Sequence, residues 1–189
     1  MAELVARIGE HKDIALVSPR VLSSKPQREY GIWYHRYLGL LTAHRVGFSF
    51  HYFTGCCLLF RRDLADRDGL FDEAFFMYGE DVELAWRLTQ QGKQMVCAQN
   101  AYVEHEYGPS VDRASFFYEY HMARGHLLLS LKTWRHPLEI PLILAVKYLT
   151  LWVRATVRAA RQRSFTPLVA LAMASLPISP SRYQLAKTD

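Results

Sequence analysis

Residues 71–81 read FDEAFFMYGED, and this stretch decides how the rest of the sequence is interpreted. It places four carboxylates and four aromatic rings directly before a helical pattern. Globular proteins rarely mix so much charge with so many large apolar groups, because a buried carboxylate must be paired or used. Either the rings form the edge of a core with the acids pointing outward, or the acids line a pocket walled by rings.

A helix is predicted to start at residue 80. Leu84 and Leu88 recur at the i, i+4 spacing, and Val82 and Trp86 form a second such pair. Gly92 follows the last periodic position and is typical of a helix end. The sequence therefore predicts a helix from residue 80 that ends at Gly92.

Glu80 and Asp81 fall in the first turn of this helix, where the helix dipole favours negative charge. On position alone, both can be ordinary acids of a helix N-terminus. The functional interpretation is that Asp81 is an ionised carboxylate held at a rigid helix start and aimed into an aromatic cleft as a general base.

Three motifs in order resemble family-2 glycosyltransferases, in particular the rhamnosyltransferase-like branch. The first is FDExFFxYGEDVEL at residues 71–84, with Arg87 one turn further. The second is TGCCLLFRR at residues 54–62, and the third runs from Gly92 to AYVEH at residues 101–105. The resemblance covers roughly residues 13–108 and continues more loosely through the helix that follows.

The resemblance implies an α/β fold: the acceptor-side part of a GT-A, Rossmann-like glycosyltransferase domain that lacks its N-terminal nucleotide-binding half. It implies inverting transfer of a sugar from a nucleotide-sugar to a glycan or lipid-linked glycan in cell-surface polysaccharide synthesis. Asp81 would be the catalytic base. The implied acceptor-binding residues are Glu80, Asp72, Glu73, Tyr78, Phe76, Trp86, Gly55, Arg61 and Arg62. The rings can equally be packing residues, and the two arginines can be solvated basic residues.

The resemblance also makes His105 a metal ligand, for a Mg or Mn ion that the complete enzyme is expected to bind. The other ligands would come from the nucleotide-binding half, so we expect no tight metal site and no transfer activity in this chain alone. Residues 66–68 read DRD and match the letters of a metal-binding Asp-x-Asp motif. They precede the 71–81 stretch instead of closing a nucleotide-binding strand, so we interpret them as a solvated helix end.

The basic charge of the chain is concentrated in its last part. Of the net charge of +5, residues 140–189 carry +6 and the preceding residues −1. Residues 137–153 are mostly apolar, and Arg154, Arg158, Arg161 and Arg163 follow. This pattern favours a helix lying on an anionic membrane surface, with a partner subunit or a true span as alternatives. No nucleic-acid partner is expected, because no recognised RNA-binding motif accompanies the charge.

We expect two regions, residues 1–112 forming the transferase part and residues 113–189 a helical, basic, membrane-facing part. Residues 1–13 hold no apolar signal segment, and Cys56, Cys57 and Cys97 lack metal-ligand spacing and are expected to be reduced core residues. Both features predict a cytosolic location. Together with the basic, membrane-facing part, they predict a peripheral protein on the cytoplasmic face of the cell membrane. The alternative function is a non-catalytic, membrane-associated module that binds glycans or another subunit.

Hydrophobic periodicity predicts the remaining elements. Helices are expected over residues 2–11 and from about 116 to 134. Strands are expected at 14–17, where Ser18-Pro19 would stop the first one, then at 53–60, 94–98 and 102–105. Residues 23–52 are rich in aromatic rings but have no clean period, and we expect a long loop there.

Overall fold

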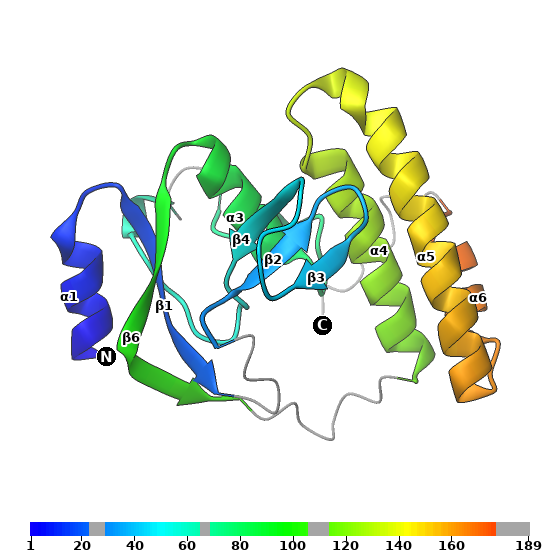
Figure 1. The fold of residues 1–189 in the computed structure, drawn as a ribbon, viewed down its shortest axis with the longest axis horizontal. Coiled ribbons are helices and arrows are strands. Elements are labelled where there is room, and N and C mark those ends of the chain that lie inside the picture. The colour runs from blue at the N-terminus through cyan, green and yellow to red at the C-terminus, as the bar shows by residue number, and fades with distance from the viewer. Residues whose placement is uncertain (23–28, 65–68, 106–113, 177–189) are drawn as a thin grey trace, which may run out of the picture.

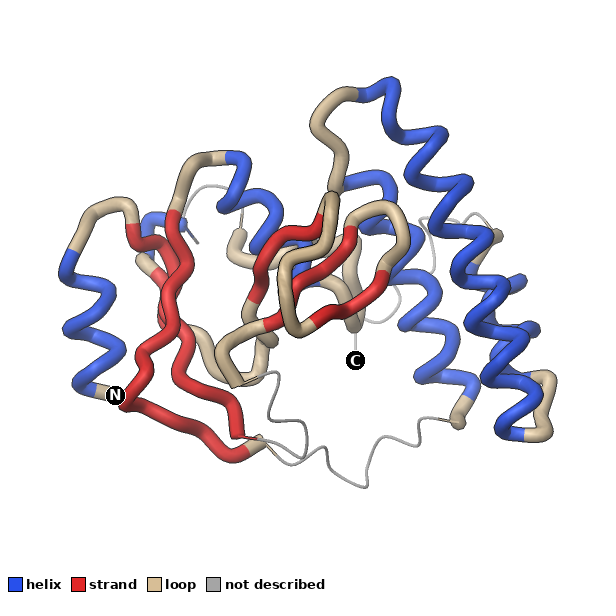
Figure 2. The backbone as a smooth tube through the Cα atoms, viewed as in Figure 1, coloured by secondary structure: helices blue, strands red, loops and turns tan. Residues whose placement is uncertain are grey.

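The computed structural model describes residues 1–22, 29–64, 69–105 and 114–176. Two small sheets and several helices make a mixed α/β fold, as predicted at that level. One sheet lies at the N-terminal end of the molecule, the other at its centre, and a group of helices at the opposite end (Figure 1, Figure 2).

The first sheet has the strand order β5-β1-β6. Strand β1 (Ile14–Leu22) is central, β6 (Gln94–Glu104) runs parallel to it and β5 (Leu59–Phe60) antiparallel. Helix α1 (Ala2–Glu10) covers this sheet, and its buried Leu4 packs with residues of β1 and β6. The predicted first helix and the strand after it are confirmed.

Two strand boundaries differ from the prediction. Strand β1 continues through Pro19. Strand β5 pairs only with Leu16 and Val17, so along that edge of β1 no described strand needs a backbone N–H from residue 19, which proline lacks. Strand β6 is one strand instead of two. Its register with β1 jumps after Ala98, so residues 99–101 are absorbed as an irregularity inside the strand.

The predicted long loop at residues 23–52 is wrong for the part that the structure describes. Strands β2 (Ile32–His35), β3 (Leu40–Thr42) and β4 (Ser49–Tyr52) form an antiparallel sheet with the order β3-β2-β4. Each strand has only three or four residues. Aromatic residues occupy both faces of the sheet, so the alternation of apolar and polar residues that identifies a strand is missing.

The predicted strand at residues 53–60 is also largely wrong, since only the short β5 forms there. Cys56 lies in a turn and is exposed, while Cys57 and Cys97 are partly buried. All three cysteines are free, as expected, but Cys56 is not a core residue.

Helix α3 (Glu80–Gln90) forms as predicted and packs against β4, β6 and α4 (Phe116–Lys132). Gly92 follows α3 with a φ of +68°, which suits a glycine after a helix. One core cluster unites the central sheet, α3 and α4, including Tyr34, Trp86 and Leu129. The two regions expected from the sequence therefore share a core.

The last helices form a compact group with α4. After the short 3₁₀ turn η2 (Pro137–Glu139), α5 (Ile140–Gln162) and α6 (Thr166–Ala174) pack against α4. The stretch Pro137–Gln162 is the one described helix that is long and apolar enough to cross a membrane, and length and composition alone are weak evidence for a span.

Candidate functional site

The 71–81 stretch enters α3 through two consecutive residues with left-handed backbone conformations. Tyr78 has a φ of +66° and Gly79 a φ of +104°. Glycine adopts such angles freely, whereas a tyrosine does so at a cost of about 1–3 kcal/mol. The chain therefore accepts strain directly before the two carboxylates of the helix start.

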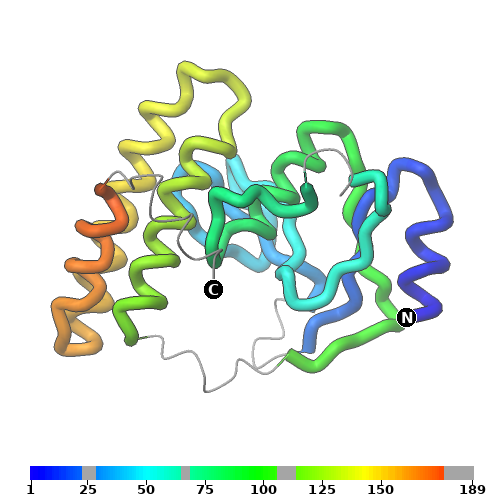
Figure 3. Tube along the Cα trace, turned by 180° about the vertical axis from the view of Figure 1, so that it is seen from behind, coloured from blue at the N-terminus to red at the C-terminus, as the bar shows by residue number. Residues whose placement is uncertain are grey.

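Contacts with α4 hold this strained turn in place. A Cβ atom on Gly125 would lie 2.2 Å from the carbonyl oxygen of Tyr78, so only glycine permits this approach. The ring of Tyr78 also packs on Tyr118, with 5.4 Å between the centroids. Figure 3 shows, from behind, the segment that leads into α3 running beside α4. The sequence offered no signal for this role of Gly125.

The structure brings Asp81 together with Gly55, which are 26 residues apart. The backbone N–H of Gly55 donates to Oδ2 of Asp81 at 3.1 Å, and that of Val82 donates to Oδ1 at 2.8 Å. One hydrogen bond on each oxygen fixes the plane of the carboxylate and leaves acceptor capacity on both oxygens for a further donor. Sequence analysis assigned both residues to the site but could not show that they are joined.

Asp81 has the most perturbed carboxyl group of this segment. Burial is the main cause, and the adjacent Glu80 carboxylate adds to it, so that the pKa of Asp81 rises to about 6. Backbone hydrogen bonds, those from Gly55 and Val82 among them, act in the opposite direction and lower the pKa. Glu80 itself has an oxygen, Oε2, that is buried without a hydrogen-bond partner among the described residues. A carboxylate poised near neutral pH is suited to accept a proton from a hydroxyl group.

Asp72 anchors the start of the segment and does not share a hydrogen bond with Asp81. Its Oδ2 forms a 2.6 Å ion pair with Lys132 of α4, and its Oδ1 accepts the N–H of Ala74 at 2.9 Å. Burial, the largest single influence, acts to raise the pKa of Asp72, but Lys132 and the hydrogen bonds together hold it below its usual value. Glu73, next to it, is exposed.

An exposed group of aromatic rings lies beside this segment. Phe76 is 57% exposed, and its ring centroid lies 5.0 Å from that of His121 and 6.4 Å from that of Phe117. Phe117 and His121 are 4.4 Å apart. Flat rings that remain open to water offer stacking faces for sugar rings. Sequence analysis named Phe76 but missed the two residues of α4, although the ring-rich run at 116–121 was the available signal.

Trp86 and Arg61, which the sequence assigned to acceptor binding, do not join the exposed rings around Phe76. Trp86 is 5% exposed and packs on Phe50 in the shared core, with 5.0 Å between ring centroids. The Arg61 guanidinium donates to backbone carbonyls of Ile8, His11 and Ile14 at 2.7–2.9 Å, so it joins the end of α1 to β1. Arg62 is exposed next to it. Contact of these residues with an acceptor stays a prediction.

The residues described here do not by themselves fit a divalent metal. His105 directly follows β6, and its backbone N–H donates to the carbonyl of Leu22 at 3.0 Å. Within the described ranges, no group of three or more His, Cys, Asp or Glu side chains is placed to hold a metal ion. The DRD sequence at residues 66–68 lies outside the described residues.

Comparison with known proteins finds a rhamnosyltransferase and an O-antigen biosynthesis protein. Over 116 residues, the chain is 37% identical to the N-acetylglucosaminyl-diphospho-decaprenol L-rhamnosyltransferase of two Mycobacterium tuberculosis strains, covering 58% of this chain and 38% of each relative. Over 54 residues, it is 44% identical to the O-antigen biosynthesis protein RfbC of Myxococcus xanthus, covering 28% of this chain and 4% of that protein.

No model of a known protein family matches the chain, and no solved structure matches it. The chain spans well under half the length of the curated relatives that it matches. The resemblance read from the sequence is nevertheless confirmed, because the chain matches a rhamnosyltransferase and an O-antigen biosynthesis protein. The chain contains a glycosyltransferase-like region that is a distant, partial homologue of the mycobacterial rhamnosyltransferase and of RfbC.

Proposed function

We propose that this chain is the acceptor-side part of an inverting, family-2 glycosyltransferase with a partial GT-A fold. It would act in cell-surface polysaccharide synthesis, taking a sugar from a nucleotide-sugar and transferring it to a glycan or lipid-linked glycan. The observation that carries the proposal is the Asp81 carboxylate, oriented by two backbone N–H groups at the start of α3 and shifted to a pKa of about 6. The similarity to a rhamnosyltransferase supports the reaction class.

In the proposed reaction, an acceptor hydroxyl oxygen attacks the anomeric carbon of the donor sugar. The new C–O bond forms as the bond from that carbon to the nucleotide diphosphate breaks, and the diphosphate leaves with the bonding electron pair. Ionised Asp81 takes the hydroxyl proton. One displacement inverts the anomeric centre and requires no covalent enzyme intermediate.

The other residues of the segment would position the acceptor. Phe76 stacks on a sugar ring, and Tyr78 shapes the turn that sets the direction of Asp81. Glu80, Asp72 and Glu73 accept hydrogen bonds from acceptor hydroxyls. A divalent Mg or Mn ion belongs to the proposal only for the complete enzyme, where His105 would supply one ligand.

The decisive experiment replaces Asp81 in a complete, active version of the enzyme. We expect Asp81→Asn to lower kcat by about 10²–10⁴-fold, because a general base contributes that much. In the unsubstituted enzyme the rate should fall as the pH drops below about 6, where Asp81 becomes protonated. Asp63→Asn, at an exposed position outside the segment, is the matched control and should keep full activity. An unchanged kcat in Asp81→Asn would refute the base assignment.

The proposal places this part of the enzyme on the cytoplasmic face of the membrane, with α5 in the lipid interface. Leu142, Leu149, Val153 and Val157 of α5 are exposed, and Arg161 and Arg163 at its end are exposed as well. Apolar side chains beside exposed cations suit an anionic lipid surface.

Flotation with liposomes tests this attachment. The chain should float with vesicles that contain anionic lipid and much less with neutral vesicles. The double substitution Leu149→Glu and Val153→Glu should reduce flotation, because it places charge on the exposed face of α5 without entering the core. Equal flotation of the substituted chain, or none with anionic vesicles, would contradict the interfacial arrangement.

A further inference from the structure

A pocket lies along the free edge of the central sheet, away from Asp81. Its volume is about 440 Å³, and it is bounded by β4, the C-terminal half of α3 and the segment before η2. Its lining includes the arginines Arg36, Arg45 and Arg135 and the rings of Trp33, Phe48, Phe50, His51 and Trp86. Pockets of this size accommodate small ligands such as a substituted sugar ring.

The lining of this pocket is positively charged. It contains three arginines and no aspartate or glutamate. Arg36 is 3% exposed and already has a partner, since its guanidinium pairs with Glu139 at 2.6 Å. Arg45 and Arg135 are exposed, and no ion pair joins either guanidinium to a carboxylate of the described residues. Two cations are therefore available for an anion.

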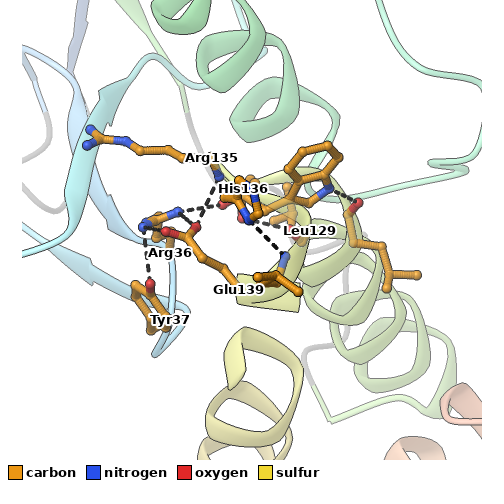
Figure 4. A network of polar contacts seen from close by, with 10 residues as sticks. Arg36, Tyr37, Leu129, Arg135, His136 and Glu139 are labelled. Carbon is orange, nitrogen blue, oxygen red and sulfur yellow. Dashed lines mark hydrogen bonds and ion pairs between the residues drawn. The ribbon is translucent and has the colours of Figure 1, made fainter. Parts of the chain in front are cut away.

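The Arg36–Glu139 pair gives the pocket a rigid side. Glu139 also accepts a hydrogen bond from the backbone N–H of Arg135 at 3.0 Å, and this bond fixes the backbone of Arg135. Figure 4 shows the Arg135 side chain extending on the same side of this network as the Arg36 guanidinium. The side chain of Arg36 is itself held between rings, 4.7 Å from the Tyr37 centroid and 5.6 Å from that of Trp86.

Aromatic rings and a strand edge supply the rest of the recognition surface. Trp33 and His51 face each other across β2 and β4, with 5.3 Å between their ring centroids. Burial lowers the pKa of His51, so its ring is neutral at pH 7 and can border a sugar without adding charge. Strand β4 is at the edge of its sheet, where backbone N–H and C=O groups can bind hydroxyl groups.

We propose that this pocket binds an anionic sugar, meaning a sugar ring that carries a phosphate or a carboxylate. The rings of Trp33 and His51 stack on the sugar, and Arg45 and Arg135 bind its negative group. Trp86 and Thr89 lie five and eight residues beyond Asp81 on α3, about 8–12 Å along the helix axis. The pocket is thus separate from the proposed catalytic residue, and its occupation does not depend on sugar transfer.

Titration calorimetry on the whole 189-residue chain tests the proposal with four probes. These are glucose 1-phosphate, glucuronate, neutral glucose and inorganic phosphate. We expect at least one of the two anionic sugars to bind at least about tenfold more tightly than both glucose and phosphate. Only an anionic sugar can stack on the rings and pair with the arginines at the same time. No preference for either anionic sugar overturns the proposal, and equal binding of phosphate alone shows a general anion site.

Substitutions locate the site. Arg45→Ala and Arg135→Ala should each weaken binding of the anionic sugar by about tenfold, because each removes a charge-assisted hydrogen bond. Both positions are exposed, so unfolding midpoints should not change. Arg7→Ala, on α1 at the N-terminal end of the molecule and away from the pocket, is the control and should bind as before (Figure 1).

Two further outcomes would overturn the assignment. Unchanged binding in both arginine variants would place the ligand elsewhere. Binding of single-stranded oligouridylate at least about tenfold tighter than the sugars, lost in the same two variants, would identify a nucleic-acid site. Because no transfer activity is measured, failure of this proposal and failure of the proposed transferase function are distinguishable.

Discussion

The start of α3 and the interface between α5 and the central sheet both hold a charged group away from water, but in different ways. Asp81 receives two backbone N–H bonds and remains partly open to solvent. Lys147 of α5 is 0% exposed, and its Nζ has no hydrogen-bond partner among the described residues. The ring of Tyr34 lies over Nζ, with 5.2 Å from Nζ to the ring centroid. An ionised group that is oriented and reachable can do chemistry, whereas one that is merely buried costs stability.

The two pKa values move in opposite directions for the same main reason. Burial raises the pKa of Asp81 to about 6 and lowers the pKa of Lys147 to about 7. Neighbouring charge of the same sign adds to each shift, from Glu80 in the first case and Arg36 in the second. Arg154 and His126 also face this interface, and the ring of His126 accepts a 3.1 Å hydrogen bond from, or donates one to, the Tyr34 hydroxyl.

The largest effect on stability is expected at Lys147. Lys147→Met keeps the length of the side chain and removes the buried charge, so it should stabilise the fold by roughly 2–4 kcal/mol at pH 6. The unfolded chain binds more protons than the folded one between the two pKa values, about 7 and 10.5, so wild-type stability rises with pH across that window. The gain of the variant should therefore disappear towards pH 10.5.

Urea unfolding at pH 6 and pH 9 measures this difference. A variant that is less stable than the wild type at pH 6 would show that Lys147 has a stabilising partner. In that case the contrast with Asp81 would fail.

The next effect concerns the turn that presents Asp81. Gly125→Ala should destabilise the fold by about 1–3 kcal/mol, because the new Cβ would meet the Tyr78 carbonyl oxygen at 2.2 Å. Helix propensity alone predicts the opposite sign, a gain of about 1 kcal/mol. Gly9→Ala on α1, where a Cβ would meet nothing within 4 Å, is the control and should show that gain. Equal gains at both positions in thermal unfolding would mean that α4 does not support the turn.

The smallest effect is expected from removing the Asp81 charge. Asp81→Asn should stabilise the fold at pH 7 by about 1–2 kcal/mol, reduced by the residual exposure of the group. The folded state binds more protons than the unfolded one between about pH 4 and 6, so wild-type stability falls as the pH rises through that window. Chemical unfolding at pH 4 and pH 7 should show this slope in the wild type and its loss in the variant. A variant that is less stable at pH 7 would mean that the carboxylate is held for structure instead of chemistry.

Local patterns predicted the parts of the fold that depend on near neighbours. Helix α3 has a clean i, i+4 period and a glycine after its end, and it formed within two residues of its predicted end. The carboxylates of its first turn, the resemblance to transferases and the basic end of the chain were equally readable from residue order. The central sheet was not, because its strands are short and carry rings on both faces.

By itself, the sequence determined the α1, α3 and α4 helices, the buried first strand, and Asp81 as a carboxylate at a helix N-terminus. Each of these depends on residues within one or two turns of one another. The tertiary structure decided the bond from Gly55 to Asp81, the fit of Tyr78 against Gly125, the burial of Trp86 and the pocket beside β4. These features join residues far apart in the chain, and they exist only where packing brings backbone groups and rings into contact.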